Sequence, residues 1–144
     1  MTRALPGVYV VSVVTADRQI VLVVDDSDDM RALLTMALRG AGYAVAQAAG
    51  GHEALGYLRS EVAPALIVLD LRMPVMDGWG FLAARAEYED LSDIPVLIYS
   101  AEGDIDQTRM LPPLAGFISK TMPITQVVAE VHRICTARPT SLAL

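Results

Sequence analysis

From Ile20 onward, short apolar runs alternate along the chain with segments whose apolar residues recur at the period of a helix. The runs are rich in β-branched residues, and three of them are almost wholly apolar, which is typical of strands buried on both faces. They predict five strands, at Ile20–Val24, Tyr43–Gln47, Ala65–Leu69, Ile94–Ile98 and Gly116–Ile118.

The segments between these runs predict helices. Apolar residues recur at spacings of three and four along Met30–Ala41 and along Ile124–Cys135, which places them on one face of a helix in each segment. Weaker stripes predict two more helices over residues 52–62 and 79–89. A short helix is expected over Gly103–Leu111, because the pair of prolines that follows it cannot donate hydrogen bonds within a helix.

This alternation predicts an α/β domain built as (βα)₅, with a five-stranded parallel sheet and helices on both of its faces. The domain is expected to span residues 20–137, and residues 138–144 would form a C-terminal tail. Residues 1–19 stand outside the pattern as an N-terminal extension. Because Val8–Thr15 has strong β propensity, the extension is expected to add a strand or to contact a neighbouring chain.

The composition narrows the class of protein. The chain has 144 residues, of which 53% are apolar, as expected for one globular domain. Its single cysteine, Cys135, excludes a disulfide framework and a four-ligand Cys/His zinc site, and its place on an apolar helix face predicts a core residue. The formal charge of −6 argues against direct nucleic-acid binding. The apolar runs are too short to insert into a membrane, and the first residues do not resemble a signal peptide, so a cytoplasmic location is expected.

Polar side chains follow four of the predicted strands, at the point where each strand ends. Asp25 and Asp26 follow the first strand, Asp70 the third, Ser100 the fourth, and Lys120, which is the only lysine, the fifth. Because the carboxyl ends of parallel strands meet at one edge of a sheet, these side chains are expected to converge there.

The chemistry of this set favours phosphoryl transfer. Three carboxylates in one crevice repel each other, so a cation is expected among them. Mg²⁺ (or Mn²⁺) fits, because it is typically held by carboxylates together with water and phosphate oxygens. One carboxylate can then stay ionised and attack a phosphoryl group, while Lys120 and Ser100 offer a charge and a hydrogen-bond donor to the phosphoryl oxygens. The set therefore predicts a phosphate-accepting site.

Each of these residues also has a purely structural interpretation. The aspartate pair could cap the helix that follows it, a role that Ser27, Asp28 or Asp29 could fill as well. Ser100 alone is typical of a turn, and Lys120 alone is typical of a solvated surface. The occurrence of all these residues at strand ends is what favours a functional site.

Four segments resemble the receiver domain of bacterial two-component response regulators, in particular the chemotaxis-regulator type. They are Val23–Arg31, Val68–Gly78, Ile98–Ser100 and Gly116–Lys120, and the resemblance extends from about Ile20 to Ala137. It implies a flavodoxin-like fold with strand order 2-1-3-4-5.

The resemblance also implies roles for single residues. Asp70 matches the phosphoacceptor, which takes a phosphoryl group from a phosphohistidine. Asp26 matches the direct Mg²⁺ ligand, Asp25 the acid that usually acts through water, and Arg72 the residue whose backbone carbonyl binds the metal. The domain would therefore phosphorylate itself at Asp70 and slowly lose the phosphoryl group again, without being an enzyme that turns over other substrates.

Further residues match the switch of these proteins. Ser100 is at the position of the switch hydroxyl, Lys120 is at the position of the basic residue that binds phosphoryl oxygens, and Phe117 is at the position of the switch aromatic. The resemblance implies that the hydroxyl moves toward the phosphoryl group and that the ring turns inward. Both changes would alter a surface formed by the fourth helix, the fifth strand and the fifth helix.

Two features distinguish this chain from the usual pattern. The family usually has proline directly after the lysine, whereas Thr121 follows Lys120 here and proline comes only at Pro123. Arg72 and Glu102 each lie two residues past a site residue, at positions that tune how fast the acyl phosphate is lost. Their opposite charges suggest that they pair across the mouth of the site and hinder the hydrolytic water, the alternative being two independent solvated side chains.

The expected partners follow from the resemblance. They are a sensor histidine kinase or a histidine phosphotransfer protein, and a downstream target protein, with a homodimer as a further option and with neither nucleic acid nor membrane bound directly. A stand-alone receiver is expected. Two alternatives are a receiver-like module that binds a partner without phosphorylation and an aspartyl-phosphate hydrolase of the dehalogenase type. The hydrolase is disfavoured because Arg72 stands where those enzymes have a second acid.

Overall fold

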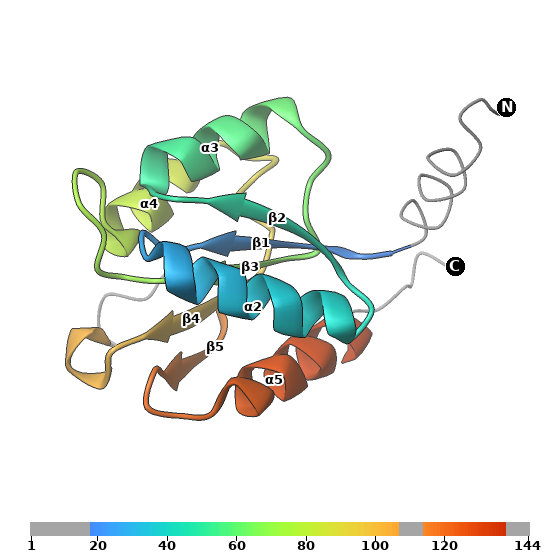
Figure 1. Ribbon diagram of the computed structural model, residues 1–144. Helices are drawn as coiled ribbons and strands as arrows, with labels where there is room; N and C mark the ends of the chain where they lie inside the picture. Colours follow the sequence, from blue (N-terminus) through green and yellow to red (C-terminus); the bar gives the residue numbers. More distant parts are fainter. Residues whose placement is uncertain (1–17, 107–113, 138–144) are drawn as a thin grey trace, which may run out of the picture.

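Five parallel strands form one sheet in the computed structural model of the chain, which describes residues 18–106 and 114–137. The order across the sheet is β2-β1-β3-β4-β5 (Figure 1), and every pair of neighbouring strands is parallel. This order confirms the predicted flavodoxin-like fold. The strands are β1 (Ile20–Val24), β2 (Ala44–Ala48), β3 (Leu66–Leu69), β4 (Val96–Ser100) and β5 (Leu114–Ser119).

Helices cover both faces of the sheet, because a helix connects each parallel strand to the next. One face is covered by α2 (Asp28–Gly40) and α5 (Ile124–Ala137), which lie in front of the sheet in Figure 1. The other face is covered by α3 (Gly51–Ser60) and α4 (Gly78–Arg85). A short 3₁₀ turn, η1 (Glu102–Asp104), follows β4.

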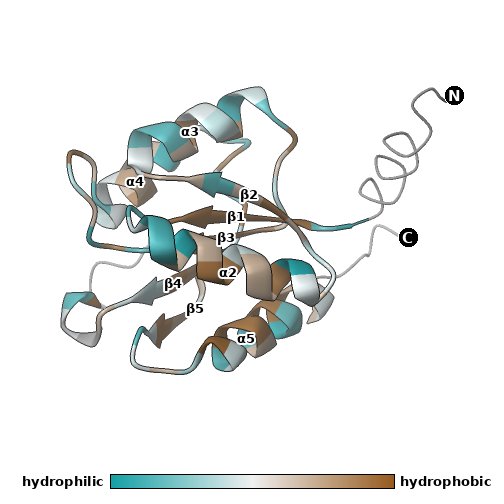
Figure 2. Ribbon diagram, in the orientation of Figure 1, coloured by the Kyte–Doolittle hydropathy of each residue, from teal (hydrophilic) through white to brown (hydrophobic). Residues whose placement is uncertain are grey.

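Strand β1 contributes alternate side chains to the two hydrophobic cores. Leu22 and Val24 belong to the core beneath α3 and α4, whereas Val21 and Val23 belong to the core beneath α2 and α5. Burial on both faces makes such a strand apolar along its whole length, and β1 is accordingly brown in Figure 2. Polar residues are therefore confined to the ends of these strands.

Side chains of the loops cap the helices that follow the first and third strands. The Ser27 hydroxyl accepts a hydrogen bond from the Met30 N–H at 3.2 Å and is the N-cap of α2. The Asp77 carboxylate accepts one from the Gly80 N–H at 2.8 Å and caps α4. Since Ser27 fills the capping role, the neighbouring aspartate pair is not needed for it.

Strand β4 lies two residues later in the chain than the strand predicted at Ile94–Ile98. Ser100 still pairs with Ser119 of β5, and the Lys120 N–H donates to the Ser100 carbonyl at 2.9 Å. The backbone ladder thus extends past the apolar side chains, and a strand inferred from those side chains alone ends too early.

Helix α4 ends at Arg85, four residues before the end predicted from its stripe. The N–H groups of Glu87 and Tyr88 donate to carbonyls three residues earlier, so the chain leaves the helix in tighter turns. The buried Arg85 guanidinium donates to the Ile94 carbonyl at 2.5 Å and ties the end of the helix to the segment that enters β4. A tertiary hydrogen bond of this kind leaves no trace in the periodicity of the sequence.

Some of the expected elements fall on residues that the structure does not describe. The strand expected at Val8–Thr15 and the tail 138–144 lie outside the described residues. Of the short helix expected over Gly103–Leu111, the structure describes the η1 turn at its start, and residues 107–113 again lie outside. These expectations stay predictions.

The start of α4 lies very close to the end of β3. A Cβ atom on Gly78 would lie 2.7 Å from the Asp70 carbonyl oxygen and 2.7 Å from the Leu71 Cα. The Gly78 N–H uses this closeness to donate to the Leu71 carbonyl at 2.8 Å. Only glycine permits this approach, which holds the loop after Asp70 in place.

We therefore expect Gly78→Ala to lower the free energy of unfolding by about 1–3 kcal/mol, because the added methyl group meets backbone atoms that cannot move aside. Urea denaturation measures this change. Gly56→Ala in α3 is the matched control, since a Cβ there meets nothing within 4 Å, and it should leave stability unchanged or slightly raised. Equal stability of the two variants would contradict the argument.

Candidate functional site

The predicted polar residues meet at the carboxyl edge of the sheet. Asp25 directly follows β1, Asp70 follows β3, Ser100 ends β4, and Lys120 follows β5. Backbone hydrogen bonds continue the sheet through these positions, since the Asp70 N–H donates to the Val24 carbonyl at 2.9 Å. The side chains are therefore held by the rigid part of the fold rather than by free loops.

The Asp70 carboxylate is buried, with 5% of the residue exposed, and both of its oxygens have partners. Oδ1 accepts hydrogen bonds from the Ser100 hydroxyl at 2.8 Å and from the Arg72 backbone N–H at 3.3 Å. Oδ2 lies 3.2 Å from the Lys120 Nζ. The Ser100 oxygen in turn accepts from the Leu71 N–H at 3.2 Å, which fixes the direction of the hydroxyl.

Lys120 links the two buried carboxylates. Its Nζ donates to Asp25 Oδ2 at 2.9 Å and also contacts Asp70. Burial works to lower the pKa of Lys120, but the hydrogen bond to Asp25 and the charges of Asp70 and Asp25 outweigh it and raise that pKa above its ordinary value. The ammonium group therefore stays charged beside Asp70, and it lies 6.0 Å from the centre of the Tyr99 ring.

The environment of Asp25 disfavours its ionised form. Burial is the main cause that raises its pKa above the ordinary value, and the charge of Asp70 adds to this. The Ser27 N–H, at 2.9 Å from Oδ1, and Lys120 offset only part of the effect. An ionised Asp25 is thus held in a place that would favour a further positive charge.

Asp26 completes a group of three acids. One carboxylate oxygen from each of Asp25, Asp26 and Asp70 lies within 4.8 Å of the others, and Asp26 is the exposed member. Arg31 donates to the Asp25 backbone carbonyl at 2.7 Å and to the Asp28 carboxylate at 2.5 Å, so the loop that carries the acids is tied to α2. A cluster of oxygen donors that is open on one side fits the coordination preferences of Mg²⁺ or Mn²⁺.

These groups line one cavity at the sheet edge. Besides the site residues already named, its wall includes the loop after β3 and the turn after β4, and the full lining is Asp25, Asp26, Ser27, Asp70, Arg72, Met73, Pro74, Ala101, Asp104 and Lys120. The three aspartates predicted to bind the metal, together with Lys120, therefore face a common space.

Asp104 is a member of this wall that sequence reasoning missed. Both Nε and Nη2 of Arg72 donate to its carboxylate, at 3.1 and 2.7 Å. The sequence predicts Glu102 as the partner of Arg72, and the side chain of Glu102 lies outside the described part of the structure. The only hint in the sequence is that Asp104 is a second acid, two residues after Glu102. Nothing in the sequence shows which of the two acids binds Arg72.

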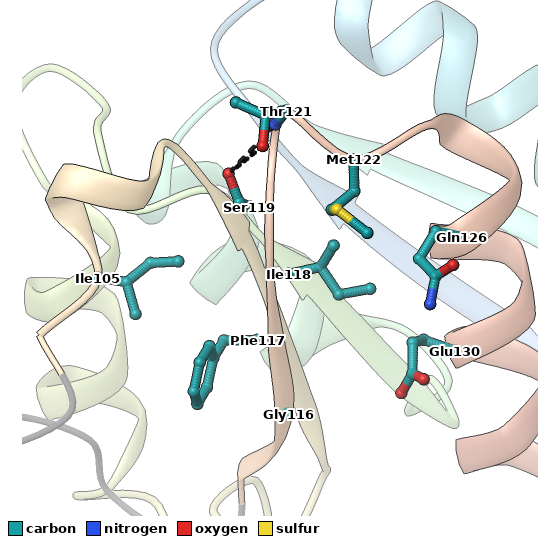
Figure 3. A pocket seen from close by; sticks show the side chains of 9 residues that line it. All are labelled: Ile105, Gly116, Phe117, Ile118, Ser119, Thr121, Met122, Gln126 and Glu130. Atoms are coloured by element: carbon teal, nitrogen blue, oxygen red, sulfur yellow. Dashed lines mark hydrogen bonds between the residues drawn. The ribbon is translucent and has the colours of Figure 1, made fainter.

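The predicted switch aromatic lies apart from the acids. Phe117 is 45% exposed on β5 and lines a second hollow. Figure 3 shows Phe117 and Ile105 on one side of the strand, with Ile118, Gln126 and Glu130 on the other. Phe117 lines this hollow and is not part of the lining of the cavity around Asp70.

The cysteine and the two histidines do not belong to the site around Asp70. Cys135 is buried in the core beneath α5, which confirms its predicted place. The exposed His132 has its Nδ1 3.2 Å from the Tyr43 hydroxyl, and His52 is exposed on α3. Within residues 18–106 and 114–137, none of the helices combines the length and the apolar character that crossing a membrane requires.

Comparison with known proteins assigns the family. Residues 21–132 match the response regulator receiver domain, and the chain belongs to this family. The transcriptional regulatory protein PrrA of Mycobacterium tuberculosis is 38% identical over 121 residues, which are 82% of this chain and 50% of PrrA. The probable transcriptional regulator ycf27 of Cyanophora paradoxa is 42% identical over 85 residues, which are 59% of this chain and 34% of that protein. The chain thus spans half or less of the length of these curated relatives.

Solved receiver domains have the same fold. The chemotaxis protein CheY4 of Vibrio cholerae superimposes with a TM-score of 0.69 at 27% identity, covering 81% of this chain and 98% of its own. The receiver domain of a signal transduction histidine kinase from Syntrophus aciditrophicus gives a TM-score of 0.75 at 28% identity, with 84% and 92% covered. The resemblance found in the sequence is therefore confirmed for the family and the fold.

The electrostatics of the site predict a stability change. Because the pKa of Asp25 is raised in the folded state, its ionised form costs stability at neutral pH, and this cost disappears as the pH falls through that raised pKa. Asp25→Asn should therefore raise the melting temperature at pH 7 in the presence of EDTA, by roughly 2–8 °C if it recovers about 1 kcal/mol.

The pH profile distinguishes this cause from a general packing effect. The difference between wild type and variant should shrink as the pH is lowered toward 4, because Asp25 of the folded wild type then takes up a proton and becomes neutral, as the amide of the variant already is. A difference that is constant from pH 7 to pH 4 would contradict the assignment.

Proposed function

We propose that Asp70 is the phosphoacceptor of this receiver domain and that a phosphohistidine on a sensor kinase or a histidine phosphotransfer protein is the donor. The observation that carries the proposal is the surroundings of its carboxylate, which is buried and held between the Ser100 hydroxyl and the Lys120 ammonium. Both groups can also bind the oxygens of a transferred phosphoryl group. Family membership supports the same role.

In the transfer, a carboxylate oxygen of Asp70 forms a bond to phosphorus, and the bond between phosphorus and the donor's imidazole nitrogen breaks. The electron pair of that bond leaves with the imidazole, so the charge moves from the carboxylate to the phosphoryl oxygens and the leaving group. Lys120 neutralises part of the charge on the acceptor side, because its raised pKa keeps it protonated. The site thus supplies orientation and positive charge, which are the main demands of phosphoryl transfer.

The acids would hold Mg²⁺ or Mn²⁺. Carboxylates of Asp25, Asp26 and Asp70 are close enough to act together, and the backbone carbonyl of Arg72 is the fourth protein donor of this proposal. Bound there, the cation offsets the repulsion among the acids and neutralises charge on the phosphoryl oxygens. The raised pKa of Asp25, caused chiefly by burial, supports a need for such a charge at this place.

Ser100 and Phe117 would carry the signal to the surface. The Ser100 hydroxyl donates to Asp70 Oδ1. A phosphoryl group on Asp70 would offer this hydroxyl a new hydrogen-bond acceptor. Movement of β4 would be transmitted to its neighbour β5, where the exposed Phe117 can turn inward. A downstream target protein would recognise the changed surface. A second copy of the chain could bind to the same surface and form a homodimer.

Arg72 and Glu102 would tune how long the phosphoryl group persists. Each lies two residues past a site residue, and Arg72 lines the cavity that contains Asp70. Arg72→Ala should shorten the lifetime if the guanidinium protects the acyl phosphate.

We expect wild-type protein incubated with radiolabelled acetyl phosphate and Mg²⁺ to take up acid-labile phosphate at Asp70. Asp70→Asn should reduce this uptake at least about a hundredfold, because the amide lacks the nucleophilic charge. Asp90→Asn is the matched control, since it removes the same charge from an exposed position in the loop after α4 and should not alter uptake.

The outcomes separate the candidate functions. Uptake that is equal in wild type and Asp70→Asn would overturn the assignment of the acceptor. A wild type that takes up no label from acetyl phosphate or from a phosphorylated kinase would overturn the phosphoacceptor function and favour a receiver-like module that only binds a partner. Sustained release of phosphate from a small phosphomonoester would favour the hydrolase.

A further inference from the structure

The pair of Arg72 and Asp104 connects two walls of the Asp70 cavity. Arg72 belongs to the loop after β3, and Asp104 ends the η1 turn after β4. The guanidinium donates through two nitrogens to the two carboxylate oxygens, at 3.1 and 2.7 Å, and this paired geometry fixes the orientation of the two groups. The hydrogen bond to Arg72 is also the main cause that lowers the pKa of Asp104, so the acid stays ionised.

The exposure of the two side chains shows what the pair cannot do. The Asp104 side chain is only 19% exposed, whereas the Arg72 side chain is 81% exposed. A side chain that is so exposed covers little of the cavity, so the pair is a poor lid against water. The carboxylate is therefore the more enclosed partner, and the guanidinium is the partner that solvent can reach.

Arg72 has a second anion within reach. Its backbone N–H already donates to Asp70 Oδ1 at 3.3 Å, so its side chain starts at the edge of the acceptor carboxylate. The charge of Asp70 also acts on the guanidinium, although more weakly than the hydrogen bond and the charge of Asp104 do. A phosphoryl group on Asp70 would carry about −1.5 to −2 charges on three acceptor oxygens, in place of the single charge of the carboxylate.

We propose that Asp104 is a positioning residue, which competes with a phosphoryl group on Asp70 for the guanidinium of Arg72 and thereby sets the lifetime of that group. The inference rests on the proposed function of Asp70. Before phosphorylation, Arg72 stays with Asp104. After phosphorylation, the guanidinium divides its time between the Asp104 carboxylate and the phosphoryl oxygens at the mouth of the cavity.

The competition affects hydrolysis for a geometric reason. Loss of the phosphoryl group requires the oxygen of a water molecule to bond to phosphorus on the side opposite Asp70. The bond between phosphorus and the Asp70 oxygen breaks, its electron pair returns to the carboxylate, and the water's proton passes to solvent as inorganic phosphate leaves. A guanidinium on the phosphoryl oxygens at the mouth lies in the path of that water, whereas a guanidinium held by Asp104 does not.

The test is the decay of the label on Asp70 after acetyl phosphate has been removed. Asp104→Asn should lengthen the lifetime roughly two- to fivefold, the ratio that corresponds to the usual strength of an exposed ion pair. Arg72→Ala should shorten it, and Asp104→Asn should change nothing further in an Arg72→Ala background. Asp104→Glu should stay near wild type because it keeps the carboxylate, and the distant Asp90→Asn should equal wild type. The dependence on Arg72 is what a merely structural role of Asp104 would not produce.

Two results would overturn the inference alone: a shorter or unchanged lifetime in labelled Asp104→Asn, or the same lengthening when Arg72 is absent. Asp104→Ser removes the charge with a different side chain and must change the lifetime in the same direction, so a folding defect of one variant does not decide the outcome. A wild type that takes up no label would overturn the proposed function and this inference with it, which distinguishes the two failures.

Discussion

The rest of the site depends on one half-buried ammonium group. Lys120 lies between the carboxylates of Asp25 and Asp70, and neither acid is more than 5% exposed. Two acids buried side by side without a cation would disfavour ionisation of at least one, and an acceptor carboxylate that is protonated is a poor nucleophile. The charge of Lys120 reduces the repulsion between the two carboxylates, yet the pKa of Asp25 stays above its ordinary value. The acids of the site therefore carry more negative charge than Lys120 alone offsets. A bound divalent cation would therefore stabilise such a site, because it would offset the remaining repulsion among the acids.

The parallel sheet makes this arrangement possible because it fixes residues that are far apart in the sequence. Asp25 and Lys120 are 95 residues apart, yet their side chains are hydrogen-bonded, since each directly follows a strand of the same sheet. The burial of β1 and β3 on both faces leaves their carboxyl ends as the places where polar side chains can reach a shared space. Gly78 adds the last constraint, because its missing side chain lets α4 begin against the end of β3, next to Asp70. Stability and reactivity thus depend on the same few strand ends.

The sequence was informative where hydrophobic burial decides the structure. The parallel sheet with helices on both faces and the convergence of Asp25, Asp70, Ser100 and Lys120 follow from apolar runs that end in polar residues, whereas the strand order was implied by the family resemblance. The sequence was less informative where single tertiary contacts decide. The end of α4 depends on the hydrogen bond from the buried Arg85 to the Ile94 carbonyl, and Arg72 binds Asp104, which lies at the end of the 3₁₀ turn after β4. Neither contact has a periodic signal, so neither could be predicted from spacing.

The Arg72–Asp104 pair differs in kind from the cluster around Lys120. The cluster around Lys120 is held by burial of its acids and by several hydrogen bonds at once, whereas an ion pair with an exposed guanidinium contributes little to stability and is screened by salt. This difference suits a site that gains a phosphoryl group, because the Arg72–Asp104 ion pair can be exchanged for the new anion while the cluster around Lys120 stays in place. Ile105 follows Asp104 directly and lines the hollow beside Phe117, so the turn that carries this exchangeable contact also borders the surface on β5. If Arg72 exchanged Asp104 for a phosphoryl group, the lifetime of that group would change. The release of Asp104 would also alter the position of the neighbouring Ile105 relative to the exposed Phe117 ring.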